Sequence, residues 1–231
     1  MDLGPEYDGS TRAWGACRPG SIPGGPTDMK NASYVRRLLE AEAAAILCIP
    51  VDNPFDKVVV ALHRTLKKHG KVVVTGVGKA GDVGRKIVSA WNSTGIPSVF
   101  LSPLDARHGD LGVIGPRDML FLISNSGKTS EITELVRLAR RLHPAITTVC
   151  LTGNPSSPLA RAADHVLSTG NPKEICPLGL TPTTSVIAML AIADVLTVLS
   201  MQRRQYSPAE YHLRHHGGYL GKKAKRLSKR A

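Results

Sequence analysis

The spacing of hydrophobic positions changes near residue 70. Over 31–48, apolar side chains recur every three or four residues, which is typical of an amphipathic helix. A similar pattern predicts a second helix over 55–69, and we expect Gly70 to end it in a left-handed conformation. From 71 onwards the apolar residues instead come in short runs rich in β-branched side chains, which predicts strands.

Strands and helices then alternate to residue 201. We expect strands over 71–75, 98–101, 119–124, 146–152 and 165–168, and helices over 81–91, 130–143, 157–163 and 183–201. Alternation with short joints indicates a three-layer α/β fold, in which a parallel sheet carries helices on both faces.

The ends of the chain differ from this core. Residues 1–29 are rich in Gly and Pro, and we expect them to be disordered. Residues 30–220 form the predicted single domain, and 221–231 form a basic tail. The net charge is +12, and six of the lysines and arginines lie in the last ten residues. We therefore expect this end of the chain to be solvated and disordered. A specific anionic partner for the tail is the alternative, and we do not expect nucleic-acid binding.

Composition agrees with an ordinary globular protein, with 42% hydrophobic and 21% charged residues. The apolar stretch Val186–Leu199 is interrupted by Asp194, so we expect no membrane span, and we find no secretory signal. The four cysteines lack metal-type spacing, which favours a reducing cytoplasm.

Two joints after predicted strands carry candidate chemistry, because ligands of parallel sheets bind beyond the carboxyl ends of the strands. The joint 76–81 matches GxGxxG, but the acid expected about 20 residues on is missing, so a tight turn is favoured over a dinucleotide site. The joint 124–131 lacks the first glycine of a P-loop. Its four hydroxyls and one glycine before a helix favour phosphate binding, with an elaborate helix cap as the alternative.

The joint 124–129 resembles the SxSGxT signature of SIS (sugar isomerase) domains. Segments at 76–79, 106–112, 173–183 and 215–218 are similar to those of bacterial arabinose 5-phosphate isomerases, in order and with near-matching spacing from about 40 to 220. The resemblance implies a flavodoxin-like sheet, a sugar-phosphate substrate, no cofactor and a homo-oligomer, namely a tetramer.

The resemblance also implies the site residues. The catalytic positions are Lys79, Glu131, Glu174 and His215. The substrate-binding positions are Gly78, Gly95, His108, Ser124, Asn125, Ser126, Thr129 and Ser130. Departures from the family pattern are Ala80 in place of a serine, His216 in place of a proline, and Ser102 in place of a histidine proposed to bind zinc. We therefore expect no metal site, and we expect regulation to differ because the paired CBS modules of the family do not follow.

Together these features predict an isomerase that interconverts D-ribulose 5-phosphate and D-arabinose 5-phosphate through an enediol. Such chemistry needs a base for a carbon-bound proton and a group that moves protons between two oxygens. We expect Glu174 to be the stronger base, because Glu131 lies in the first turn of its helix and Glu174 is expected in a loop. The alternatives are an isomerase of another phosphosugar, such as a hexulose or heptose phosphate, and a non-catalytic phosphosugar sensor.

Overall fold

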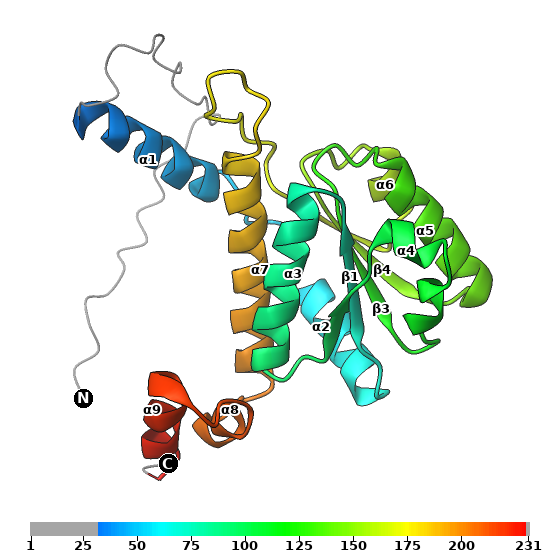
Figure 1. Ribbon diagram of the computed structural model, residues 1–231, viewed down its shortest axis with the longest axis vertical. Coiled ribbons are helices and arrows are strands. Elements are labelled where there is room, and N and C mark those ends of the chain that lie inside the picture. The colour runs from blue at the N-terminus through cyan, green and yellow to red at the C-terminus, as the bar shows by residue number, and fades with distance from the viewer. Residues whose placement is uncertain (1–31, 230–231) are drawn as a thin grey trace.

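The computed structural model describes residues 32–229, so the disorder expected for 1–29 lies outside the described residues. The elements along the chain are shown in Figure 1. The helices are α1 (Ala32–Leu47), α2 (Phe55–Lys67), α3 (Lys79–Ser93), α4 (Pro103–Ala106), the 3₁₀ turn η2 (Asp110–Val113), α5 (Ser130–Leu142), α6 (Pro158–Arg161), α7 (Thr184–Arg203), α8 (Pro208–Arg214) and α9 (Gly218–Ser228). The strands are β1 (Val72–Gly76), β2 (Ser98–Phe100), β3 (Met119–Ile123), β4 (Thr147–Thr152) and β5 (His165–Ser168).

The five strands form one parallel sheet in the order β2-β1-β3-β4-β5, which confirms the expected flavodoxin-like fold. Successive side chains of β1 and β3 point to opposite faces and are buried on both. One hydrophobic core joins the sheet to α2, α3 and α7, and the other joins it to α4, α5 and α6. The result is the predicted three-layer arrangement (Figure 1).

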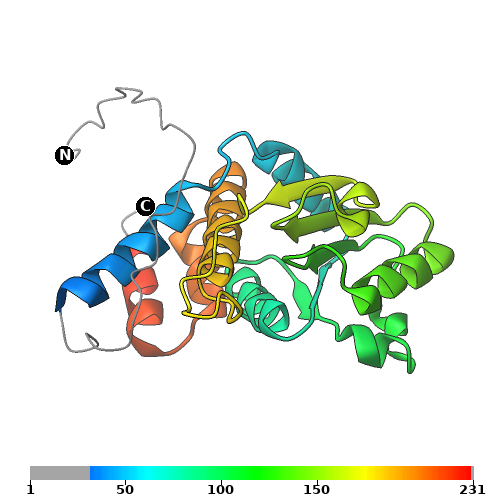
Figure 2. The ribbon, with the colours of Figure 1, turned by 90° about the horizontal axis from the view of Figure 1, so that it is seen from above.

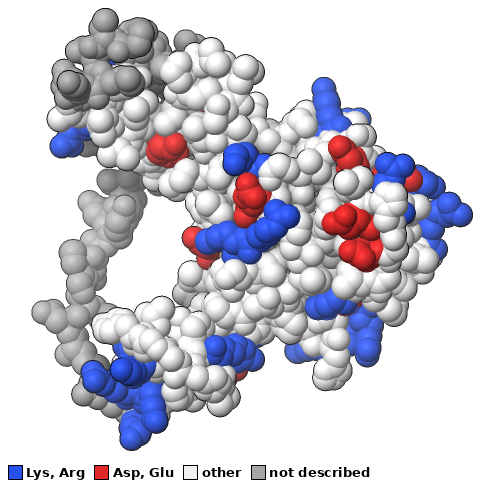
Figure 3. Space-filling model, in the orientation of Figure 1, with Lys and Arg blue, Asp and Glu red and all other residues white. Residues whose placement is uncertain are grey.

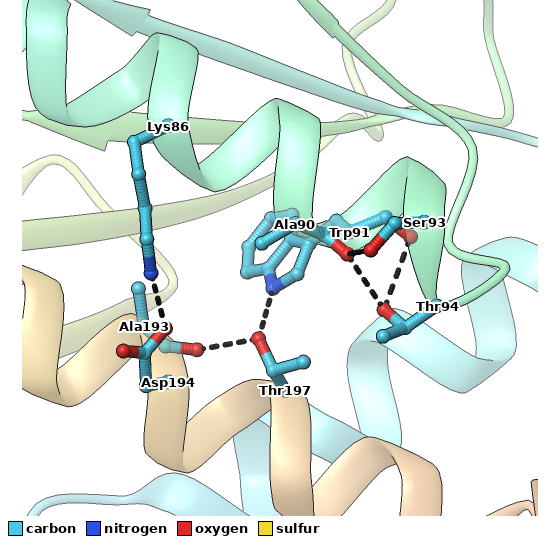
Figure 4. Close-up of polar contacts among 8 residues, drawn as sticks. All are labelled: Lys86, Ala90, Trp91, Ser93, Thr94, Ala193, Asp194 and Thr197. Carbon is cyan, nitrogen blue, oxygen red and sulfur yellow. Dashed lines mark hydrogen bonds and ion pairs between the residues drawn. The ribbon is translucent and has the colours of Figure 1, made fainter. Parts of the chain in front are cut away.

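Helices α3 and α7 lie side by side with the same chain direction (Figure 4). The indole N–H of Trp91 donates to Thr197 Oγ1 at 3.0 Å, and Lys86 forms an ion pair with Asp194 one turn earlier on both helices. Counting back along both helices from these two pairs brings Lys79, the first residue of α3, level with the first turn of α7. This alignment brings the beginnings of α3 and α7 to the same edge of the sheet.

Helix α7 is long and apolar enough, by length and composition alone, to cross a membrane, with a mean hydropathy of 2.0. The expectation that Asp194 disqualifies this stretch on composition is therefore wrong. In the fold, half of its most apolar window is buried, and it packs against α1, α2 and α3. The packing of α7 against these three helices explains part of its apolar character.

The end of α2 differs from the sequence expectation. Helix α2 ends with His69, not Gly70, in the left-handed region, at φ 59°. Gly70 is needed for close approach, because a Cβ there would lie 2.0 Å from the carbonyl oxygen of Arg117.

The basic tail is not a disordered end over its described part. Residues Gly218–Ser228 form α9, which packs against α8 and buries Gly221 and Ala224. Its lysines and arginines gather on one end of the molecule (Figure 3). Helices α1, α7, α8 and α9 lie on the same side of the domain in both ribbon views (Figure 2).

Candidate active site

The carboxyl ends of β1 and β3 form the topological switch point of the sheet, because the strand order reverses between these neighbours. Gly76 pairs with Ile123 at the last position of both strands. The loops that follow therefore begin side by side. One leads to Gly78 and Lys79, and the other to the serine loop, defined here as residues 124–130.

The serine loop is folded by its own hydroxyl groups. Ser124 Oγ lies 2.7 Å from Thr129 Oγ1 and accepts the backbone N–H of Gly127 at 3.1 Å. Ser126 Oγ accepts the backbone N–H of Lys128 at 3.2 Å. Gly127 has φ 61°, and a Cβ there would lie 1.9 Å from Ser157 Oγ. Both the left-handed backbone and the lack of space for a side chain therefore favour glycine.

The serine loop leaves the start of α5 available to an anion. Thr129 occupies the N-cap position, but its hydroxyl is bonded to Ser124 and makes no cap hydrogen bond. The elaborate-cap alternative is therefore not what the structure shows. A helix start without a side-chain cap presents backbone N–H groups and the positive end of the helix dipole, the two features that bind phosphate.

Glu131 lies in the first turn of α5, as expected. Its own backbone N–H and the Ser130 hydroxyl, at 2.9 Å, donate to its carboxylate and lower its pKa, and the charge of Arg107 adds to this effect. Glu131 is therefore an ionised carboxylate beside the serine loop.

Glu174 lies in the loop before α7, as expected, but its carboxylate contacts the start of that helix, which the sequence did not predict. Its Oε2 accepts the backbone N–H of Thr183 at 2.6 Å and that of Ser185 at 3.4 Å, at the beginning of α7. The hydroxyls of Thr183 and Thr184 donate to the same oxygen at 2.8 and 3.2 Å. Partial burial acts to raise the pKa of Glu174, but the hydrogen bonds from Ser185 and Thr183 outweigh it and hold the pKa below its usual value.

This finding removes the basis for ranking the two carboxylates. Both Glu131 and Glu174 accept hydrogen bonds at a helix start, and both have a lowered pKa. They differ in how they are held. The backbone and hydroxyl donors at the start of α7 all bond to Oε2 of Glu174, and these bonds fix the plane of its carboxylate.

Lys79 is the first residue of α3, at the same edge as Glu174 by the α3–α7 register. Its ammonium lies 3.5 Å from Asp82 Oδ2, and both side chains are largely exposed. A cation on a flexible stem at this position can reach a bound anion. Gly78 precedes it with φ 57°.

His108 and Asn125 complete the residues that the structure places on this edge. His108 is exposed in the turn between α4 and η2. The side-chain oxygen of Asn125 is buried without a hydrogen-bond partner among the described residues. A buried amide oxygen without a donor is rare in a native fold, so Asn125 has a role beyond packing.

Gly95 and His215 lie at the opposite edge. Gly95 follows α3 and precedes β2, and its carbonyl accepts a hydrogen bond from Arg204 at 2.8 Å. Arg214, the neighbour of His215, packs against Gly95. Helix α7 separates this edge from Glu174, and its 20 residues span about 30 Å. One copy of the chain therefore does not bring His215 or Gly95 to the other site residues.

Glu174 is held by residues that were not predicted as site residues, namely Thr183, Thr184 and Ser185. Their signal was present, because a run of hydroxyl residues directly before an apolar helix is typical of a helix start. Ser157, which sits against Gly127 and caps α6, was also missed.

A cavity of about 510 Å³ lies elsewhere, at the amino ends of the strands, lined by residues that include Arg64, Lys68, Arg117 and Asp164. It contains none of the candidate site residues. Within residues 32–229, no three His, Cys, Asp or Glu side chains are grouped to hold a metal ion.

Comparison with known proteins agrees with this geometry. The SIS domain family matches residues 65–199. Arabinose 5-phosphate isomerase KdsD of Escherichia coli K12 is 48% identical over 196 residues, which cover 85% of this chain and 58% of that protein. The chain thus spans little more than half the length of the curated relatives that it matches.

Solved structures extend the likeness to three dimensions. A candidate phosphosugar isomerase involved in capsule formation from Bacteroides fragilis has a TM-score of 0.79 at 49% identity, covering 81% of this chain and 98% of that chain. Protein c3406 of E. coli CFT073, solved in complex with A5P, has a TM-score of 0.70 at 29% identity, covering 80% of this chain and 99% of that chain. The chain belongs to the SIS domain family.

Proposed function

We propose that this protein interconverts D-ribulose 5-phosphate and D-arabinose 5-phosphate through an enediol intermediate and without a cofactor. One observation carries the proposal. The uncapped, hydroxyl-rich start of α5, which can bind an anion, lies at the same edge of the sheet as the carboxylates of Glu131 and Glu174. The similarity to KdsD enzymes, and to a structure that holds A5P, supports this choice of sugar.

The serine loop binds the substrate phosphate in this account. The start of α5 supplies backbone N–H donors, and the hydroxyls of Ser124, Ser126 and Thr129 exchange their internal hydrogen bonds for bonds to phosphate oxygens. Ser130 adds a further hydroxyl, and Lys79 neutralises charge on the phosphate or on the developing enediolate. His108 and Asn125 bind sugar hydroxyls.

A carboxylate removes the proton from the carbon next to the carbonyl. Glu174 is our choice, because its hydrogen bonds to the start of α7 fix the carboxylate plane and leave its second oxygen to face the reacting carbon. The removed proton returns to the neighbouring carbon, while a second proton moves between the two oxygens. Glu131, beside the serine loop, is the alternative base.

His215 participates only if a second copy of the chain supplies it. The side of the domain that carries α1, α7, α8 and α9 exposes large apolar side chains, namely Val35, Leu39, Leu47, Val198, Leu213 and Leu220. Apolar side chains gathered on one side mark an interaction surface. We infer a homo-oligomer, a tetramer as the family resemblance implies, in which His215 of one copy completes the site of another and shuttles protons between the oxygens.

We place the reaction in the cytoplasm. The similarity to sugar-phosphate isomerases, which are metabolic enzymes, supports this placement. Burial raises the pKa of the Cys150 thiol to about 12, so this cysteine is an inert core residue.

The test is isomer formation from a panel of pentose, hexose and heptose phosphates by the purified protein. Turnover of D-arabinose 5-phosphate and D-ribulose 5-phosphate above the other sugars is expected. Preference for a hexulose or heptose phosphate would reassign the substrate. Binding without turnover of any sugar would identify a sensor instead of an enzyme.

A further inference from the structure

The cavity of about 510 Å³ lies at the amino ends of the strands, away from the candidate active site. Its lining comes from both faces of the sheet, because the end of α2 belongs to one hydrophobic core and the end of α5 to the other. Residues at the starts of β3, β4 and β5 complete the lining. A volume of this size is in the range of ordinary small-molecule sites.

Positive side chains dominate this cavity. Its ionised side chains are four cations and two carboxylates, namely Arg64, Lys68, Arg117, Arg140, Asp118 and Asp164. The end of α2 and the turn before β3 are held against each other, because Gly70 lies so close to the carbonyl of Arg117 that a Cβ would be 2.0 Å from its oxygen. The cations of these two segments therefore surround one space.

Both carboxylates of the cavity already have partners. Asp118 accepts the backbone N–H of Lys71 at 2.9 Å, and the ammonium of Lys71 lies 2.6 Å from its second oxygen. Asp164 Oδ2 accepts the backbone N–H and the hydroxyl of Thr148 at 2.7 and 2.8 Å, and it lies 3.8 Å from Nη2 of Arg140. The carboxylates thus pair with Lys71 and Arg140, and they leave the other three cations uncompensated.

Three cations of the cavity form no ion pair within residues 32–229, namely Arg64, Lys68 and Arg117. Cations at the end of a helix offset the negative end of its dipole, which accounts for Arg64 and Lys68 at the end of α2. It does not account for Arg117, which lies in a turn. Like charges around one space repel one another, and a bound anion would replace this repulsion by attraction.

Apolar side chains lie among these charges, namely Pro116, Pro144, Ala145 and Ile146. An inorganic ion would leave these side chains uncovered, whereas the carbon skeleton of an organic anion would contact them. Arginine favours phosphate in particular, because the planar guanidinium donates to two phosphate oxygens at once.

We propose that this cavity is a second anion site, which binds an organic phosphate with two or more negative charges, such as a nucleoside polyphosphate. It is separated from the serine loop by the length of β3, whose five residues span about 17 Å. None of its lining residues belongs to α1, α7, α8 or α9, so it does not overlap the side of the domain to which we assign the oligomer surface.

Isothermal titration calorimetry of the full chain with ATP as the probe tests this site. Wild-type protein should bind ATP, and Arg64→Gln with Lys68→Gln should weaken binding by about tenfold, since one exposed ion pair contributes up to about fivefold. Lys57→Gln with Lys67→Gln is the matched control. It removes the same two charges from exposed positions of the same helix that do not line the cavity.

Two further titrations separate the sites and the parts of the ligand. ATP binding should persist in Ser124→Ala with Ser126→Ala, because the serine loop lies at the other end of the strands. Tripolyphosphate and adenosine should both bind more weakly than ATP, because the first lacks the carbon skeleton and the second lacks the charge. Equal affinity for tripolyphosphate and ATP would contradict an organic ligand.

The proposal is overturned if wild-type protein does not bind ATP, or if the cavity variant and its control lose the same affinity. Loss of binding in the serine-loop variant alone would place ATP at the substrate site and would also overturn it. If a variant does not fold, NMR of wild-type protein decides. The amides of Arg117 and Ala145 should shift with ATP, and that of Gly127 should not. No readout depends on isomerase activity, so failure of the proposed function would be seen separately.

Discussion

The carboxylate of Glu174 accepts the backbone N–H of Thr183 at 2.6 Å and so binds the start of α7, nine residues further along the chain. The same oxygen accepts the hydroxyl of Thr183 at 2.8 Å. This contact ties the loop that carries Glu174 to the longest helix of the domain. It orients the carboxylate, lowers its basicity and makes it part of the stability of the fold.

Glu174→Gln should lower kcat by about 10²–10⁴-fold, the usual contribution of a general base, while KM changes little. Solvent-deuterium incorporation at the carbon next to the carbonyl, followed by NMR, should disappear in the same variant. If Glu174→Gln still exchanges that proton at the wild-type rate and Glu131→Gln does not, Glu131 is the base. Both variants need the comparison, because both carboxylates have a lowered pKa.

The contact between Glu174 and α7 also predicts a pH dependence of stability. A carboxylate whose pKa is lowered by folding stabilises the fold above its unfolded pKa, and this contribution disappears as pH falls through the folded pKa. The thermal midpoint of wild-type protein should therefore fall below about pH 4, near the unfolded carboxyl pKa. Glu174→Gln should be less stable at pH 7 and should lose less on acidification, and equal slopes in the two proteins would contradict this account.

The serine loop should govern substrate affinity. Ser124→Ala with Ser126→Ala should raise KM for the sugar phosphate by about 10²-fold to 10⁴-fold, since hydrogen bonds to a charged group contribute about 1.5–3 kcal/mol each. Ser156→Ala is a matched control, because Ser156 is exposed in the neighbouring loop after β4. An unchanged KM in the double variant, with circular dichroism showing an intact fold, would argue against phosphate binding at this loop.

The 30 Å span of α7 predicts complementation between copies of the chain. His215→Ala and Glu174→Gln should each be nearly inactive alone. Mixed oligomers formed by refolding the two variants together should regain activity, because some sites then combine an intact Glu174 with an intact His215. Monomeric protein by light scattering, or mixtures no more active than the separate variants, would count against a shared site.

Helix α9 should matter for catalysis through His215. A Cβ at Gly221 would lie 2.2 Å from the carbonyl oxygen of His215. Gly221→Ala should therefore displace the His215 segment and lower kcat with little effect on KM. Gly217→Ala is the control, because a Cβ there meets nothing within 4 Å. Equal activity of the two variants would show that the position of His215 is unimportant.

Much of the fold follows from the sequence, because periodicity and turn residues report burial and local conformation directly. The alternation of strands and helices predicted the parallel sheet, and the hydroxyl-rich joint predicted the edge at which the site lies. The errors arise from contacts between distant residues. The capping of α7 by Glu174, the close approach of Gly70 to Arg117 and the packing of α9 on α8 depend on tertiary geometry, which local patterns do not encode.

The same distinction applies to the site. Family resemblance selected Lys79, Glu131, Glu174 and His215 together, and the structure brings the first three to one edge. It leaves His215 at the other edge, because α8 and His215 follow the far end of α7 and lie beside Gly95.

The central claim is enediol isomerisation of a pentose phosphate, and incubation of the protein with D-arabinose 5-phosphate in D₂O tests it most directly. NMR should show D-ribulose 5-phosphate forming, together with deuterium at the carbon next to the carbonyl, and both signals should vanish in the variant that lacks the base. Bound D-arabinose 5-phosphate that neither isomerises nor takes up deuterium would contradict the claim.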